Sequence, residues 1–360
     1  MFNSSDKTTI SLIAMCLHTT LLLLRNLLHM LPYCVRRFIV RTTLYSPLWL
    51  SRLVMNFGTR PVGDESKWIH KIEQNTWKGV WIVPDLDSLE QAECDALSND
   101  LVVLYAHGGG YCKGNSTMYM ETFQLIINHL RIEHNIRASI LSLEYSLSPE
   151  HVWPKACDEA MEAYQYLTST IGIPSSKIIF AGDSAGGNLL AVTLLTIKSE
   201  KHQLHPAGAA LFSPWVDLSI NQSRLEEKYV GHYVPNYKNL SEAARLSVTQ
   251  NPQISPIYGD FSSTCPMFLS YGENELLRTS IENFKLKLEK DAVDVTTLIG
   301  KDARHVWLVY SLIATSGETF EKDCKVFIDW MASIVTVSSN VAKCQSTDVT
   351  EVAMTSISLK

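Results

Sequence analysis

The chain of 360 residues is long enough for one large domain or two modest ones. Apolar residues make up 46% and charged residues 19%, which excludes a disordered chain and leaves ample material for a core. The net charge of −6 argues against a nucleic-acid-binding protein, and the eight cysteines have no zinc-like spacing.

The positive charge is concentrated at the N-terminus. Residues 1–63 carry a formal charge of +6, whereas residues 64–360 carry −12, and no acidic residue lies between Lys7 and Asp64. We therefore predict three parts: an apolar, basic N-terminal segment over 1–63, a body over 64–335, and a mobile Ser/Thr-rich tail over 336–360.

The N-terminal segment begins with an apolar run. Residues 8–24 carry no formal charge, which is at the short limit for a membrane-spanning helix. An uncleaved anchor, a helix that caps the body, and a cleaved signal peptide are three interpretations of this run. The basic segment over 25–60 mixes arginines with aromatic residues, so it could lie in a lipid interface or cover the mouth of a pocket.

The body alternates between strand-like and helix-like stretches. Apolar runs separated by helices indicate a mostly parallel sheet, because parallel neighbours need long connections. Residues 213–262 are irregular and are predicted to form part of a lid. The predicted strands are 80–83, 101–106, 138–143, 177–181, 207–212, 266–270 and 294–299. The predicted helices are 117–134, 155–171, 185–200, 278–290 and 305–334.

The pentapeptide from Gly182 to Gly186 fits the pattern G-x-S-x-G and lies between a predicted strand and a predicted helix. This is the context of a nucleophile elbow, in which a tight turn exposes the hydroxyl of Ser184. The glycines permit the close backbone approach, and the helix N-terminus favours negative charge beside Ala185. Asp183 is expected to cap the helix or to tie down a loop.

Three glycines follow the predicted strand 101–106. In the sequence His107-Gly108-Gly109-Gly110, the backbone N–H groups can face a cavity instead of pairing within the sheet. We predict that Gly109 and Gly110, together with Ala185, form an oxyanion hole. His107 is expected to be a structural hydrogen-bonding group and not a base.

These two motifs resemble the hormone-sensitive-lipase branch of the α/β-hydrolase superfamily, and the likeness covers about residues 80–330. The stretches 144–151, 213–218 and 255–260 are also similar to parts of that family. Ser146 stands where the family usually has an arginine, which puts the usual salt bridge behind the elbow in doubt. With its basic N-terminus, the chain looks most like fungal steryl acetyl hydrolases, and then like arylacetamide deacetylases.

The resemblance implies an α/β-hydrolase fold with helices on both sides of the sheet, an N-terminal helical cap, and a Ser…acid…His order of catalytic residues. The family's spacing selects Glu275 as the acid, with Glu273 as the alternative. Among the histidines, His305 alone follows the acid, just before a predicted helix, and is therefore expected to be the base.

The predicted activity is hydrolysis of a carboxylic ester through an acyl-enzyme, without a metal or organic cofactor. By resemblance, the substrate is a small apolar ester with a short acyl group on a bulky alcohol such as a sterol or terpenoid. An acyltransferase with the same acyl-enzyme and a non-catalytic ligand-binding protein are the alternatives. We expect membrane association at the endoplasmic reticulum, with a cytoplasmic protein as the alternative location.

Overall fold

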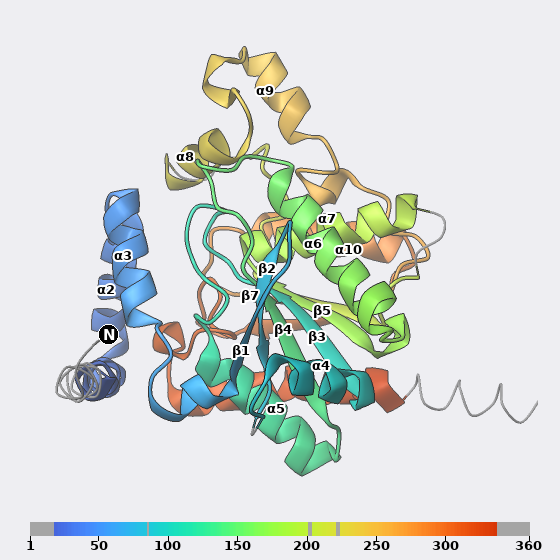
Figure 1. The fold of residues 1–360 in the computed structure, drawn as a ribbon. Helices are drawn as coiled ribbons and strands as arrows, with labels where there is room; N and C mark the ends of the chain where they lie inside the picture. The colour runs from blue at the N-terminus through green and yellow to red at the C-terminus, as the bar shows by residue number, and fades with distance from the viewer. Residues whose placement is uncertain (1–17, 85, 201–203, 221–223, 337–360) are drawn as a thin grey trace, which may run out of the picture.

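The computed structural model describes residues 18–84, 86–200, 204–220 and 224–336 (Figure 1). Its centre is an eight-stranded sheet with the order β1-β2-β4-β3-β5-β6-β7-β8. The pairs β1–β2 and β2–β4 are antiparallel, and every other pair is parallel. The predicted mostly parallel sheet is thereby confirmed. The strands are β1 Ile69–Glu73, β2 Lys78–Ile82, β3 Leu101–Ala106, β4 Ala138–Leu143, β5 Ile178–Asp183, β6 Gly208–Phe212, β7 Met267–Gly272 and β8 Val295–Gly300.

Helices cover both faces of the sheet, as the runs of apolar residues on every central strand require. One face packs against α4, α6, α7 and α10, and the other against α5 and a helix over residues 317–336. Strands β3 to β7 are buried along their whole length. These helices are α4 Leu89–Ser98, α5 Met120–His134, α6 Lys155–Gln165, α7 Ala185–Ser199 and α10 Arg278–Lys290.

Two groups of helices lie outside this sandwich (Figure 1). A helix over residues 18–30, α2 (Tyr33–Tyr45) and α3 (Leu48–Gly58) form an N-terminal cap beside the sheet. Helices α8 (Arg224–Tyr233) and α9 (Glu242–Thr249) come from the predicted lid region and lie beyond the carboxyl ends of the strands.

Arginine side chains attach the cap to the body. The buried guanidinium of Arg36 in α2 donates to the backbone carbonyls of Ser311, Leu312 and Ala314 at 3.0–3.3 Å. Arg52 in α3 pairs with Glu150 at 2.7 Å. Two of the arginines of the basic segment therefore hold the cap against the body, as expected for helices that cover a pocket.

Part of the predicted apolar run, residues 8–17, lies outside the described residues, as do residues 337–360 of the predicted tail. Within the part of the chain that the structure describes, no helix is long and apolar enough to cross a membrane. The predicted division of the chain at residue 63 stays a prediction.

The structure differs from the sequence predictions in several elements, and α8 and α9 lie within the region 213–262 that was predicted to be irregular. Strand β1 and helix α4 were not predicted, because β1 is a largely exposed edge strand and α4 carries a weak apolar stripe. The helix predicted over 305–334 is wrong in its first part only. That segment forms turns and a short 3-10 helix (Ser311–Ile313), and the regular helix begins only at residue 317. Val306, with φ at +57°, interrupts helical geometry at the start of the segment.

Candidate active site

Ser184 lies on a sharp turn between the end of β5 and the start of α7. Its φ of 51° and ψ of −115° lie outside the favoured regions for a residue with a side chain. The turn is held by hydrogen bonds from the Ser184 N–H to the Phe212 carbonyl and from the Trp215 N–H to the Ser184 carbonyl, both at 2.9 Å. This strained, well-supported turn is what a nucleophile elbow requires.

The glycines of the elbow leave no room for a side chain. A Cβ on Gly186 would lie 2.0 Å from the backbone oxygen of Ala106, and one on Gly182 would lie 2.8 Å from the same atom. Helix α7 can therefore begin directly over β3 only because both residues are glycine.

His305 approaches Ser184 from the loop that follows β8. Its Nε2 lies 2.9 Å from the Ser184 Oγ, which is hydrogen-bonding distance. Its Nδ1 lies 3.6 Å from the Oε1 of Glu275, which is longer than a hydrogen bond. Contacts of this kind are often long without substrate and shorten in the reacting complex.

Glu275 is held in place through its other carboxylate oxygen. Its side chain is fully buried, and Oε2 accepts hydrogen bonds from the Ser213 hydroxyl at 2.6 Å and the Gly272 N–H at 2.9 Å. Oε1 is consequently the oxygen that faces His305. The alternative acid, Glu273, is exposed and accepts a bond from the Asp302 N–H, so the structure brings Glu275 to the histidine.

Ser213, at the end of β6, was not singled out as a site residue in the sequence. Its hydroxyl donates to Glu275 and accepts from the Val306 N–H at 3.0 Å, so one side chain joins the acid to the histidine loop. The signal available in the sequence was its position one strand away from the elbow, at the same edge of the sheet.

The charges around His305 favour its protonated form. Burial lowers the pKa of His305, but its contact with Glu275 and the charges of Asp183 and Glu226 outweigh burial. The net effect is a pKa above the ordinary value of 6.5. The site therefore stabilises the imidazolium that forms when the histidine accepts a proton.

Hydrogen bonds to two backbone carbonyls, those of His107 and Gly108, orient the loop over 107–110. The His107 carbonyl accepts a bond from the Tyr145 hydroxyl at 2.7 Å, and the His107 Nδ1–H donates to the Gly108 carbonyl at 2.8 Å. Because a trans peptide directs its C=O and N–H to opposite sides, the second bond turns the Gly109 N–H away from His107. His107 thus has a structural contact, as the sequence indicated.

Asp183 joins the elbow to this glycine loop. Its buried carboxylate accepts hydrogen bonds from the Gly108 N–H at 2.9 Å and from the hydroxyls of Tyr105 and Tyr119 at 2.8 Å. Burial raises the pKa of Asp183 although these donors oppose the rise. Of the two roles expected for Asp183, tying down a loop is the one that the structure shows.

Ser146, the departure from the family pattern, has its own partner. Its backbone N–H and its hydroxyl both donate to the buried carboxylate of Glu159 at 2.6 Å. Lys155 adds an ion pair to Glu159 at 3.3 Å. A serine and a lysine therefore satisfy the buried acid without an arginine at position 146.

A cavity of about 790 Å³ opens over Ser184 and His305 and extends beneath the N-terminal cap. This volume is within the range of pockets that enclose a whole drug-sized ligand. Most of its walls are apolar, and the cap, the body and α8 all contribute to them. Lining side chains include Leu22, Ile39, Leu44, Val54, Met55, Trp215, Tyr229, Leu276, Val309 and Ile313.

Residues 103–309 match the model of a family described by the alpha/beta hydrolase fold. The chain belongs to the α/β-hydrolase fold family. It is 26% identical over 211 residues to an esterase of Acinetobacter venetianus, covering 57% of this chain and 67% of that protein. It is 27% identical over 219 residues to an acetyl-hydrolase of Streptomyces hygroscopicus, covering 60% and 71%.

Solved structures of this family share the fold. An esterase/lipase from an uncultured bacterium superposes with a TM-score of 0.67 at 21% identity, over 84% of this chain and 98% of that one. A hormone-sensitive lipase from a metagenome library gives 0.64 at 23% identity, over 85% and 99%. These structures show the fold, and the esterase and acetyl-hydrolase relatives support a carboxylic-ester hydrolase that resembles the hormone-sensitive-lipase branch.

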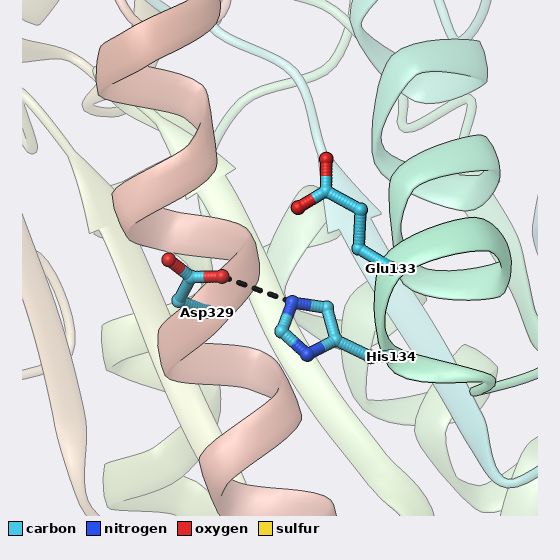
Figure 2. A group of neighbouring side chains, drawn as sticks. All are labelled: Glu133, His134 and Asp329. Atoms are coloured by element: carbon cyan, nitrogen blue, oxygen red, sulfur yellow. Dashed lines mark hydrogen bonds and ion pairs between the residues drawn. The ribbon is translucent and has the colours of Figure 1, made fainter.

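One group of potential metal ligands lies away from the cavity of this hydrolase (Figure 2). Glu133 and His134 at the end of α5 face Asp329 on the helix over 317–336, and the His134 Nε2 lies 2.9 Å from the Asp329 Oδ1. The ammonium of Lys325 pairs with Glu133 and with Asp329. Because Lys325 already pairs with both carboxylates, we interpret the group as an ion-pair network between two helices.

Proposed function

We propose that Ser184, His305 and Glu275 are the catalytic residues and that the enzyme removes a short acyl group from a bulky apolar alcohol. The observation that carries this proposal is the 2.9 Å contact between the His305 Nε2 and the Ser184 hydroxyl. A serine hydroxyl is a weak nucleophile unless a base takes its proton, and this contact supplies the base.

The reaction takes place in two halves. The Ser184 Oγ attacks the ester carbonyl carbon while its proton passes to His305, and the carbonyl oxygen becomes an oxyanion bound by the N–H groups of Gly109, Gly110 and Ala185. The intermediate then breaks its bond to the alcohol oxygen, which takes the proton from His305. Water attacks the acyl-serine in the same way and releases the acid and free Ser184.

The cavity supports the proposed size of the alcohol. A volume of about 790 Å³ far exceeds what an acetyl group needs, and the walls over the catalytic serine are mostly apolar. A panel of p-nitrophenyl esters and bulky alcohol acetates tests this preference. We expect kcat/KM to rise with alcohol size and to fall with acyl chain length.

Ser184→Ala tests the nucleophile itself. We expect kcat to fall by about 10⁴-fold or more with the fold intact. A fluorophosphonate probe should label the wild type and leave the variant unlabelled, and equal labelling of the two would refute the assignment. Product analysis with an added alcohol separates hydrolysis from acyl transfer, because transfer would form a new ester in place of free acid.

We also propose that the outer face of the cap binds a lipid surface, which would bring an apolar ester to the cavity. Large apolar side chains of the cap are exposed: Leu23, Leu24, Leu27, Met30, Phe38, Trp49, Leu53 and Phe57. Arg36 and Arg52 bind the body, but no acidic residue interrupts positions 8–63, so the remaining positive charge of the segment suits anionic lipids. The location at the endoplasmic reticulum stays a prediction.

Vesicle sedimentation tests the lipid proposal. The double variant Trp49→Ser/Phe57→Ser should bind phosphatidylserine-containing vesicles less than the wild type does, because both side chains are more than half exposed. Ile132→Ser is the control, since Ile132 is 80% exposed but lies on α5, away from the cap. Equal loss in both variants would refute a role for this face.

A further inference from the structure

We propose that helix α3 of the cap holds the oxyanion loop in its working geometry, and that Lys113 and Arg52 are the positioning residues that transmit this constraint. The inference rests on the proposed roles of Gly109 and Gly110 in the oxyanion hole. If α3 holds this loop, the N-terminal cap affects the rate of the acyl-transfer step and also forms a wall of the cavity.

The oxyanion loop continues into a tight turn over residues 109–113. The Gly109 carbonyl accepts hydrogen bonds from the N–H groups of Cys112 at 3.1 Å and Lys113 at 3.2 Å. Because the peptide is trans, these bonds direct the Gly110 N–H to the opposite side, away from the turn. The turn therefore sets the orientation of one of the proposed oxyanion donors.

This turn is tightly packed on both sides. Gly109 has a φ of +123°, and a Cβ there would lie 2.0 Å from the Lys113 carbonyl oxygen. A Cβ on Gly110 would lie 2.4 Å from the ring of Tyr229 in α8. A displacement of residue 113 toward these contacts is consequently passed to Gly109 and Gly110, since the Lys113 carbonyl and the Tyr229 ring already touch them.

The side chain of Lys113 joins the turn to the cap. Lys113 is 1% exposed, and its ammonium donates to the Leu44 carbonyl and the Ser51 hydroxyl, both at 3.0 Å. The ammonium also lies 5.0 Å from the centre of the Tyr229 ring. Burial lowers the pKa of Lys113 to about 8. A buried cation is costly unless its acceptors stay in place, so the ammonium fixes α2 and α3 against the turn.

The side chain of Arg52 binds the backbone of the same turn. Its Nε donates to the Cys112 carbonyl at 2.7 Å, and its Nη2 donates to the Ser148 carbonyl at 2.6 Å. The two terminal nitrogens of its guanidinium also bind the two carboxylate oxygens of Glu150. Arg52 therefore fastens the turn to α3 and to the body together, next to the side-chain contact that Lys113 makes.

The test measures kcat on a small ester, p-nitrophenyl acetate, that does not need the full cavity. Lys113→Met and Arg52→Gln should each lower kcat by about 10- to 100-fold with KM changed by less than about threefold, because a misplaced oxyanion donor weakens only the transition state. The affinity for an alkyl boronic acid, which forms a tetrahedral adduct with the serine, should fall in proportion to kcat. Arg52→Lys should recover part of the loss.

The matched control is Asn56→Ala. Asn56 in α3 accepts a hydrogen bond from Asn115 at 3.2 Å, so it joins the cap to the same segment but beyond the turn. Its kcat should stay within about twofold of the wild type. The rates of all variants that keep Ser184 are normalised to active sites titrated with a fluorophosphonate, so that unfolded enzyme does not contribute to the difference. The rate of Ser184→Ala is normalised to the concentration of folded protein.

The milder variant Ser51→Ala removes one acceptor of the ammonium, and we expect a loss of about three- to tenfold in kcat. The proposal is overturned if Lys113→Met and Ser51→Ala keep the wild-type kcat per active site, or if Asn56→Ala loses as much as they do. Ser184→Ala is measured in parallel. If Ser184→Ala keeps its activity, the proposed function fails, whereas an inactive Ser184→Ala with normal Lys113→Met refutes the positioning role alone.

Discussion

The role proposed for Glu275 makes a sharp prediction for Glu275→Gln. In the native site Oε2 accepts two hydrogen bonds, from Ser213 and from the Gly272 N–H. The glutamine must place its oxygen there, because its NH₂ group would face the N–H donor. The NH₂ group then faces the Nδ1 of His305 and favours the tautomer that carries its proton on Nε2. This tautomer cannot accept the proton of Ser184.

The expected loss in kcat is about 10³- to 10⁴-fold, similar to other triads forced into the wrong tautomer, which corresponds to about 4–5.5 kcal/mol in the barrier. The pH profile should change as well. Because the neutral imidazole is the base and its pKa is raised in the native site, wild-type kcat/KM should fall as the pH drops through a value above 6.5. Removing the charge of Glu275 should lower the pKa of His305, so the fall in kcat/KM should occur at lower pH.

The assay is kcat/KM for p-nitrophenyl acetate between pH 5 and 9, with thermal unfolding as a check of the fold. Glu273→Gln is the control: its carboxylate is exposed and two positions away, so we expect activity within about twofold of the wild type. A loss of less than tenfold in Glu275→Gln, or an unchanged acid limb, would refute the reasoning.

Three further changes test other parts of the structure. Ser213→Ala removes one of the two donors to Glu275 and should slow acylation about tenfold in stopped-flow measurements, since a buried hydrogen bond contributes about 1–2 kcal/mol. Gly186→Ala places a methyl group 2.0 Å from the Ala106 carbonyl and should destabilise the fold by about 3 kcal/mol or more in urea titrations. Arg36→Met removes the donor to the buried carbonyls of Leu312 and Ala314 and should lower the free energy of unfolding by about 2–5 kcal/mol, measured in the same way.

The parts of the site that depend on local sequence were predictable. A strand followed by Gly182–Gly186 and then a helix determines the elbow, and the glycines after β3 determine the proposed oxyanion loop. His305 followed from chain order. Glu275 needed the family's spacing, because the two carboxylates in this loop differ in burial and in hydrogen-bond partners, and both are properties of the tertiary structure.

Other contacts were beyond prediction because they join distant segments. The bond from Ser213 to Glu275 spans 62 positions, and the bonds from Arg36 to the segment after His305 span about 275. That segment has the apolar composition of a helix, but its residues are buried in turns and its carbonyls bind a guanidinium from the cap. In the same way, the sequence does not show which arginines of the basic N-terminus bind the body and which face solvent.

The cavity is built by two parts of the chain, the body and the N-terminal cap, and this has a consequence for substrate selectivity. The stretch that matches the family spans 103–309, whereas the outer wall of the cavity comes from residues 22–59. New selectivity can therefore arise by exchanging the N-terminal helices while the bond-breaking machinery stays constant. Any such exchange has to preserve the acceptors of Lys113 and the guanidinium of Arg52, so grafted caps that keep Ser51 and Arg52 should yield active chimeras more often than those that do not.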